Sequence, residues 1–216
     1  MNQRIKLIIN FTKGPRVLDV GCVGNNELKV DSPYWLHAHL RRNFEYVVGV
    51  DLNQEAIQTL QQMGWNVLVG DAQKLDLDEK FDTIVAGELI EHLSNPGQFL
   101  ESAKRLLNKD GRIILTTPYV FGLANVIYAL AKFPKTCSNS EHTVWFCVST
   151  LSELARRHGF SVAHWELVED YYQGIPSLKY RSLVAFLKFF GPILPKRIKS
   201  NCMLFVLEPN AGNSHT

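Results

Sequence analysis

The sequence predicts an α/β fold in which a largely parallel β-sheet is covered by helices on both faces. Short apolar runs rich in β-branched residues alternate with segments whose apolar residues recur at helical spacing. Such alternation is typical of parallel sheets with right-handed crossovers. The first five runs are nearly continuous in apolar residues, as expected for strands that are buried on both faces.

Seven strands and three capped helices are expected in order along the chain. Asn53 is a candidate cap for one helix, Asn95 followed by Pro96 starts a second, and Ser149 is a candidate cap for a third that ends before Gly159. The predicted strands are RVLDV (16–20), YVVGVD (46–51), NVLVGD (66–71), FDTIVAG (81–87), RIILTT (112–117), FSVAHWEL (160–167) and CMLFVLE (202–208).

The bulk composition indicates one globular domain. The 216 residues are 46% hydrophobic and 20% charged, with a net charge of +2, which fits a single domain over 1–210 and a flexible tail at 211–216. This charge does not indicate a nucleic-acid partner, and nothing indicates an oligomeric state. The four cysteines form no CxxC pair, and no signal-peptide run or spanning apolar stretch exists. We therefore expect a reduced, cytoplasmic protein.

Acidic residues lie at the ends of the first three predicted strands. Asp19 precedes a turn that contains Gly21 and Gly24, Asp51 ends the second strand, and Asp71 ends the third. The glycines permit close backbone approach to a ligand, and a carboxylate such as Asp51 can accept hydrogen bonds from ribose hydroxyls. Together the three acids predict a pocket for an adenosine that carries positive charge and no phosphate.

The segments VLDVGC, VVGVDL and VGDAQKLDL, followed by FDTIVAGELIEHL, resemble class I S-adenosylmethionine-dependent methyltransferases over 14–168. The resemblance implies a Rossmann-like sheet of seven strands, mostly parallel, with the last strand antiparallel beside the fifth. It also implies that Asp19 and the Gly21 turn contact the methionine part, Asp51 the ribose, and Asp71 with Ala72 the adenine. The expected cofactor-binding residues are Asp19, Gly21, Cys22, Gly24, Asp51, Leu52, Asp71, Ala72 and Glu88.

The stretch GELIEHL (87–93) places three ionisable side chains after the fourth predicted strand. If 88–92 form a helical turn, Glu88, Glu91 and His92 share one face and can hold a divalent cation. His142 in SEHTVWF is a fourth candidate ligand. The ExxEH stretch resembles that of ubiquinone-biosynthesis O-methyltransferases and small-RNA 2′-O-methyltransferases, and in the RNA group a later histidine completes a magnesium site.

Three interpretations of these residues are open. In the first, Glu88, Glu91, His92 and His142 bind Mg²⁺ or another divalent cation, which would stabilise the alkoxide of the acceptor. In the second, no metal binds, and His92 or His142 is the catalytic base. In the third, Glu88 borders the cofactor and the other residues cap a helix and pack.

Two segments, 117–142 and 170–200, are expected to cover the site and select the acceptor. The first has a hydrophobic helical pattern, and within the second the stretch 174–200 carries six basic residues and no acid. That stretch is either a lid with solvated lysines or a peripheral contact with an anionic membrane or a lipid-linked acceptor. RNA is less favoured because no RNA-binding module is visible.

The sequence thus predicts S-adenosylmethionine-dependent methylation of a hydroxyl on a small-molecule, sugar or lipid-linked acceptor. The alternatives are metal-free transfer to nitrogen or carbon, a catalytically silent adenosine-ligand binding protein, and a nicotinamide-dependent oxidoreductase. The missing GxGxxG spacing and the acid at Asp19 argue against the oxidoreductase.

Overall fold

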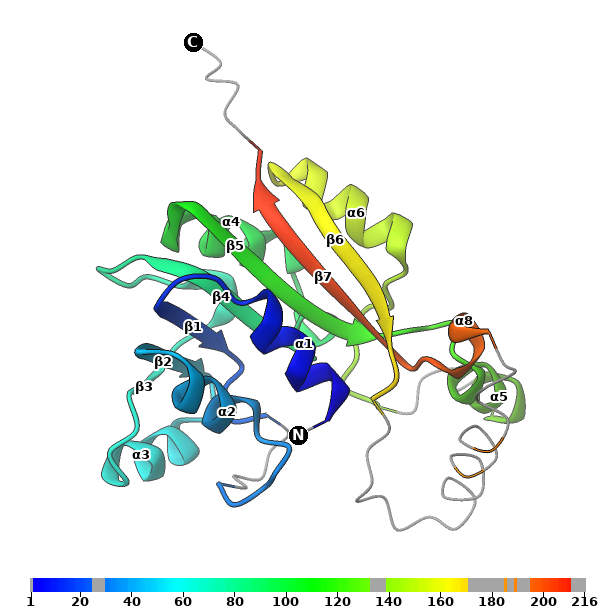
Figure 1. The fold of residues 1–216 in the computed structure, drawn as a ribbon, viewed down its shortest axis with the longest axis horizontal. Coiled ribbons are helices and arrows are strands. Elements are labelled where there is room, and N and C mark those ends of the chain that lie inside the picture. Colours follow the sequence, from blue (N-terminus) through cyan, green and yellow to red (C-terminus); the bar gives the residue numbers. More distant parts are fainter. Residues whose placement is uncertain are drawn as a thin grey trace.

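A single seven-stranded sheet forms the centre of the molecule (Figure 1). The structure is a computed structural model that describes residues 2–24, 30–132, 139–170, 185, 189 and 195–210. The strand order is β3-β2-β1-β4-β5-β7-β6. Strands β1 to β5 pair in parallel, and β7 runs antiparallel between β5 and β6, as predicted. The strands are β1 (Arg16–Val20), β2 (Tyr46–Asp51), β3 (Val67–Val69), β4 (Phe81–Gly87), β5 (Leu107–Pro118), β6 (Phe160–Val168) and β7 (Cys202–Pro209).

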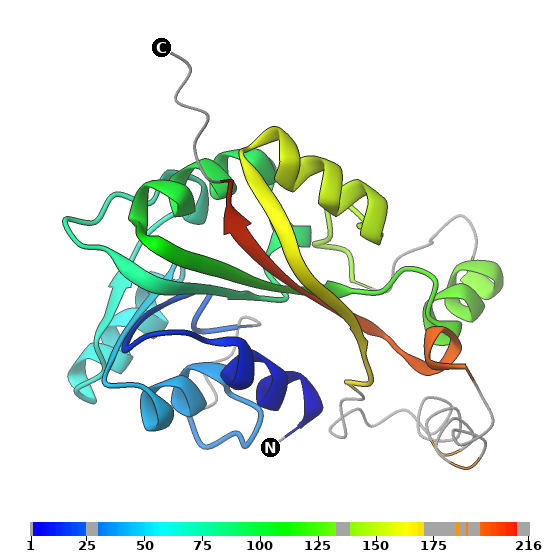
Figure 2. The same cartoon turned by 45° about the horizontal axis from the view of Figure 1, so that its top comes forward.

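Helices cover both faces of this sheet, and Figure 2 shows the resulting three layers. Because successive side chains of a strand point to opposite faces, Val17 packs with α1 and α2 on one face, whereas Leu18 packs with α4 and α6 on the other. The helices are α1 (Gln3–Phe11), α2 (Leu36–Asn43), α3 (Gln54–Gln62), α4 (Pro96–Leu106), α5 (Leu123–Lys132), α6 (Val148–Arg157) and α8 (Lys196–Lys199), with 3₁₀ turns η1 (Ala72–Lys74) and η2 (Ile90–His92).

Two of the three predicted helix caps are confirmed. The Asn53 side chain accepts the N–H of Ala56, and Asn95 accepts the N–H of Gln98. The prediction for Ser149 is wrong, because α6 begins earlier and has Cys147 as its N-cap.

Local hydrogen bonds explain this difference and the short third strand. At α6, the Thr150 hydroxyl accepts the backbone N–H of Cys147, which places Ser149 inside the first turn. At β3, the Asp71 carboxylate accepts the N–H of Gln73 and starts η1, so the chain has left the sheet before the predicted end of the strand.

The domain boundaries at 1–210 and the lid role of 117–142 and 170–200 remain predictions. Within the first segment α5 extends from the carboxyl end of β5, away from the sheet (Figure 1). Most of 170–200 and all of 211–216 lie outside the described residues. Among the described helices, none combines the length and the apolar character needed to cross a membrane.

Candidate active site

The last two residues of β1 and the turn after it, residues 19–24, are held rigidly at the carboxyl edge of the sheet. The backbone N–H groups of Gly21 and Cys22 both donate to the carbonyl of Val50, at 2.8 and 3.2 Å. The N–H of Val23 donates to Oδ2 of Asp51 at 3.0 Å. Gly21 has a φ of +82°, which a side chain would disfavour. We call residues 19–24 the β1 loop.

The β1 loop borders a cavity of about 420 Å³. Asp19, Gly21, Cys22, Gly24 and Glu88, which are five of the predicted cofactor residues, all line it. This size and the mixture of apolar walls and polar groups are typical of small-ligand sites. The cavity is also lined by residues that the sequence did not single out for binding, namely Asn2, Arg4, Ser32, Tyr34 and Asp170.

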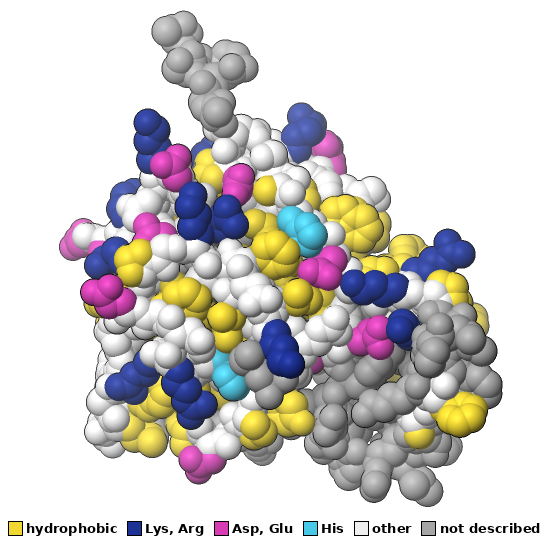
Figure 3. Space-filling view, viewed as in Figure 1, with side chains coloured by type: hydrophobic (Ala, Val, Ile, Leu, Met, Phe, Trp, Pro, Cys, Tyr) yellow, Lys and Arg dark blue, Asp and Glu magenta, His cyan; other side chains and the backbone are white. Residues whose placement is uncertain are grey.

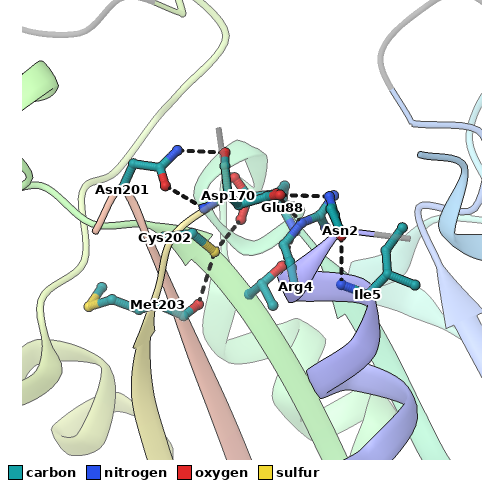
Figure 4. Close-up of polar contacts among 9 residues, drawn as sticks. Asn2, Arg4, Ile5, Glu88, Asp170, Asn201, Cys202 and Met203 are labelled. Carbon is teal, nitrogen blue, oxygen red and sulfur yellow. Dashed lines mark hydrogen bonds and ion pairs between the residues drawn. The ribbon is translucent and has the colours of Figure 1, made fainter. Parts of the chain in front are cut away.

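Arg4 on α1 is the only cation among the described residues that line this cavity. Its Nε donates to Asp170 Oδ2 at 2.6 Å, and Asn2 Nδ2 donates to Asp170 Oδ1 at 2.6 Å (Figure 4). Burial lowers the pKa of Arg4, but the charges of Glu88 and Asp170 outweigh burial and raise it above the ordinary value. The guanidinium is therefore a permanent positive charge in a largely acidic cavity.

Glu88 lies with Asn2, Arg4 and Asp170 in a group that we call the Arg4 cluster. The helical turn considered over 88–92 does not form. The backbone of Glu88 is left-handed, with a φ of +55°, and the short helix η2 begins only at Ile90. The Cys202 thiol donates to Glu88 Oε1 at 3.3 Å. Burial raises the pKa of Glu88, while Arg4 opposes that shift. Glu88 therefore does not share one helical face with Glu91 and His92.

Three of the four candidate ligands, Glu91, His92 and His142, are brought together in a second group, without Glu88. One potential ligand atom from each residue lies within 4.8 Å of the others, and the two imidazole rings are 4.6 Å apart. The backbone N–H and the hydroxyl of Thr143 both donate to the carbonyl of Glu91, at 2.9 and 3.1 Å. This attachment brings His142 beside η2.

The Glu91 carboxylate is deeply buried, with 2% of its surface exposed, and neither of its oxygens has a hydrogen-bond partner among the described residues. Burial, and then the charge of Glu88, raise the pKa of Glu91 to about 9, although its own backbone N–H and the nearby buried Thr117 hydroxyl oppose this shift without forming a well-aligned hydrogen bond. Burial also lowers the pKa of His92, against the effect of Glu141. Burial and the neighbouring His92 lower the pKa of His142. The group thus combines an unsatisfied acid with imidazoles biased toward the neutral form.

The remaining predicted cofactor residues lie at the ends of β2 and β3, outside the lining of the 420 Å³ cavity. Asp51 accepts N–H groups from Val23 and Asn53, so its carboxylate orders the β1 loop as well as the start of α3. Leu52 is 68% exposed beside it, whereas Ala72 is buried. An exposed apolar side chain at a strand end offers a surface to a flat ring.

Another cavity, of about 600 Å³, lies elsewhere. It is formed between the start of α4, the segment around Thr143 and α6, and it contains none of the predicted site residues. Volume alone therefore does not mark the reaction site. Arg4 and Asp170, which do line the cofactor-sized cavity, are 166 positions apart and carry no local sequence signal.

The site and fold match a known family. Residues 3–164 match the family model described as "Methyltransferase domain", and the chain belongs to this family. Its fold is that of the class I S-adenosylmethionine-dependent methyltransferases. The chain is 29% identical over 146 residues to a ubiquinone biosynthesis O-methyltransferase of Glaesserella parasuis, covering 59% of this chain and 58% of that protein.

A protein of the same name from Coxiella burnetii is 27% identical over 136 residues, covering 57% of this chain and 54% of the relative. The chain thus spans little more than half the length of these curated relatives. A solved SAM-dependent methyltransferase from Archaeoglobus fulgidus has a TM-score of 0.63 at 18% identity and covers 95% of this chain and 91% of its own. Magnesium protoporphyrin IX methyltransferase from Synechocystis, solved with bound S-adenosylhomocysteine, has a TM-score of 0.59 at 15% identity, with coverage of 96% and 83%.

Proposed function

We propose that this methyltransferase transfers the methyl group to a hydroxyl oxygen, with Glu91, His92 and His142 at the acceptor side. The observation that carries the proposal is the Glu91 carboxylate, which is buried next to two imidazoles and whose oxygens have no hydrogen-bond partner within the described part of the chain. A buried, unpaired acid is costly unless a ligand or ion compensates it. The printed name of the curated relatives, an O-methyltransferase, supports the same choice of atom.

The three side chains fit a divalent cation. A carboxylate oxygen and two imidazole nitrogens form a donor set that suits several divalent ions, and the unsatisfied oxygens of Glu91 are the feature that an ion would complete. When bound, such an ion supplies Lewis-acid stabilisation of a developing alkoxide. Glu88 is directed to the Arg4 cluster and is not included in this set.

The alternative without a metal uses the same residues differently. An imidazole biased toward its neutral form can accept the hydroxyl proton as a general base, and either His92 or His142 meets that condition. Transfer to nitrogen or carbon would need no cation, but it would leave the buried Glu91 carboxylate without a function.

On the donor side, we place the methionine part of S-adenosylmethionine in the cavity beside the β1 loop. Among the described residues that line this cavity, Arg4 is the cation that can form an ion pair with the methionine carboxylate. Asp19 and Glu88 are acids that can form ion pairs with its ammonium group. The ribose and the adenine then extend toward Asp51 and Asp71. The chain's task is to hold the sulfonium methyl in line with the acceptor oxygen.

The acceptor is expected to have an apolar part. A cavity of about 320 Å³ along α5 is lined mainly by apolar side chains, and Trp145 at its wall has its ring 6.0 Å from that of His142. Asn125 is the polar exception among its described lining residues. This surface favours a small aromatic or lipid-linked acceptor over a bare sugar.

A membrane or nucleic-acid partner has less support. Most of 174–200 lies outside the described residues, and in the described part Lys196 and Lys199 form ion pairs with Glu166 and Glu169 at 3.2 and 3.0 Å. These pairs reduce the positive charge available to an anionic surface. On the face seen in Figure 3, Lys and Arg side chains are interspersed with Asp and Glu. The peripheral membrane contact and the cytoplasmic location remain predictions.

The deciding experiment is calorimetric titration of Mn²⁺ and of Mg²⁺ into the S-adenosylhomocysteine complex. We expect saturable binding to the wild type, loss of it in Glu91→Ala and in His142→Ala, and retention in His158→Ala. His158 is a suitable control because it pairs with Glu101, away from the site. Absence of binding in the wild type would reject the cation. In that case a test of methyl transfer by His92→Ala and His142→Ala, with a panel of phenols and alcohols, would identify the base.

A further inference from the structure

His37 on α2 forms a buried pair with Asp19 of the β1 loop. Its Nδ1 lies 2.9 Å from Asp19 Oδ2, and the two side chains are 1% and 2% exposed. Since an ionised carboxylate can only accept hydrogen bonds, Nδ1 carries the proton of this bond. No sequence motif selects His37, which lies 18 positions from its partner.

The surroundings of His37 fix its ring in place. The Trp35 and Trp65 rings lie 5.7 and 5.6 Å from it. On a third side the imidazole contacts the backbone of β2, because a Cβ built on Gly49 would meet His37 Cε1 at 2.7 Å. A side chain enclosed in this way cannot turn away from Asp19 without disturbing the core.

The same helix end holds the β1 loop at a second point. Trp35 Nε1 donates to the carbonyl of Cys22 at 2.7 Å, and this bond is also buried. Trp35 and His37, two positions apart, therefore bind Cys22 and Asp19 of the β1 loop. Asp19 and Cys22 both line the cavity that would take the methionine part of the cofactor.

We propose that His37 is a positioning residue for cofactor binding, which holds the Asp19 carboxylate in the orientation that receives the methionine ammonium group. Asp19 lies near the carboxyl end of β1, which is paired to β2 and β4, and only 2% of its side chain is exposed. A buried carboxylate in such a place needs a fixed donor to keep one orientation. The proposal depends on S-adenosylmethionine as the cofactor and not on the acceptor or on a cation.

The test is the dissociation constant of S-adenosylhomocysteine, measured by calorimetry without metal or acceptor. An asparagine amide can replace the Nδ1 donor, whereas a glutamine amide corresponds to Nε2. We expect His37→Asn to stay within about threefold of wild type and His37→Gln to bind about tenfold more weakly, which is the scale of one lost buried hydrogen bond. His39→Gln is the matched control, since His39 is on the same helix and bonds to the carbonyl of Pro33.

A double-mutant cycle separates positioning from a general packing role. In an Asp19→Asn background, His37→Gln should change the constant by less than about twofold if His37 acts through Asp19. Equal losses for His37→Asn and His37→Gln, or the same loss with and without Asp19, would overturn the proposal. Thermal unfolding of each variant shows whether it is folded. The dissociation constants of His37→Asn and His37→Gln are then compared between folded proteins. Wild-type binding itself reports on the cofactor, and the variants report on His37.

Discussion

Replacement of Glu91 by glutamine should make the metal-free protein more stable at neutral and alkaline pH. The pKa of Glu91 is raised from 4.5 to about 9, mainly by burial. Between these values the folded protein binds a proton that the unfolded chain has released, so stability falls as pH rises through this window. The loss is about 1.4 kcal/mol per pH unit, which gives an upper bound of about 4 kcal/mol near pH 7.5.

Glutamine keeps the shape of the side chain and removes its titration. The amide is itself buried without a partner, and this costs about 1–3 kcal/mol. We therefore expect a net gain of about 1–3 kcal/mol near pH 7.5 and a net loss of up to about 2 kcal/mol near pH 5, where the titration contributes less than about 1 kcal/mol. For a chain of this size the corresponding rise in Tm is about 2–4 °C per kcal/mol.

Urea unfolding in the presence of EDTA at several pH values measures this effect. Wild type should lose stability steadily toward alkaline pH, and Glu91→Gln should show a smaller slope. Glu55→Gln, on the exposed surface of α3, is the control and should match wild type. If Glu91→Gln is no more stable than wild type at alkaline pH and has the same slope, Glu91 is not a buried unpaired acid. The case for a cation at this site would then lose its main support.

Three further predictions concern other parts of the chain. Asp51→Ala should weaken S-adenosylhomocysteine binding by about 1–3 kcal/mol in calorimetry. The substitution removes the acceptor of the Val23 N–H and the predicted acceptor of the ribose hydroxyls. Unchanged affinity would reject the ribose assignment. The Ser149 and Thr150 hydroxyls lower the pKa of Cys147 to about 7. In a Cys137→Ser background, iodoacetamide near neutral pH should therefore label Cys147 and spare the buried Cys22 and Cys202. Peptide mass spectrometry measures this, and labelling of the buried cysteines before Cys147 would refute the reasoning. Gly49→Ala should lower the free energy of unfolding by about 1–3 kcal/mol in urea, because the new Cβ would lie within 3.0 Å of three side chains. A free energy of unfolding equal to that of wild type would show that the core relaxes around this Cβ.

The sheet could be predicted from sequence because its information is local. A strand buried on both faces, such as β4, appears as an uninterrupted apolar run, and an asparagine before a helical pattern identifies the starts of α3 and α4. The cap of α6 was missed because a cysteine there is held by Thr150, a residue type that also fits a helix interior. The helices α1 and α2 were not predicted, although Asn2 caps α1 as Asn53 caps α3.

The site could be predicted only in part, because its pairs join distant segments. Candidate ligands such as His142 were found from residue type and family resemblance, and the structure places it beside His92. The partners of the acids were not found. Arg4 meets Asp170, and His37 meets Asp19, through contacts that depend on how helices cross the sheet. No periodicity or spacing encodes such a contact.

The conformation of Glu88 explains why two glutamates stand three positions apart in GELIEHL. A left-handed backbone at a non-glycine residue costs on the order of 1 kcal/mol and persists only where its surroundings hold it. Here the N–H of Glu88 is held by Thr116, and its carboxylate by the Cys202 thiol. The turn sends Glu88 toward Arg4 and the donor cavity, while Glu91, after the turn, lies beside the histidines. A regular helical turn would have put both carboxylates on one face. The left-handed residue instead separates them, so that in the function we propose one acid lies on the donor side and the other on the acceptor side.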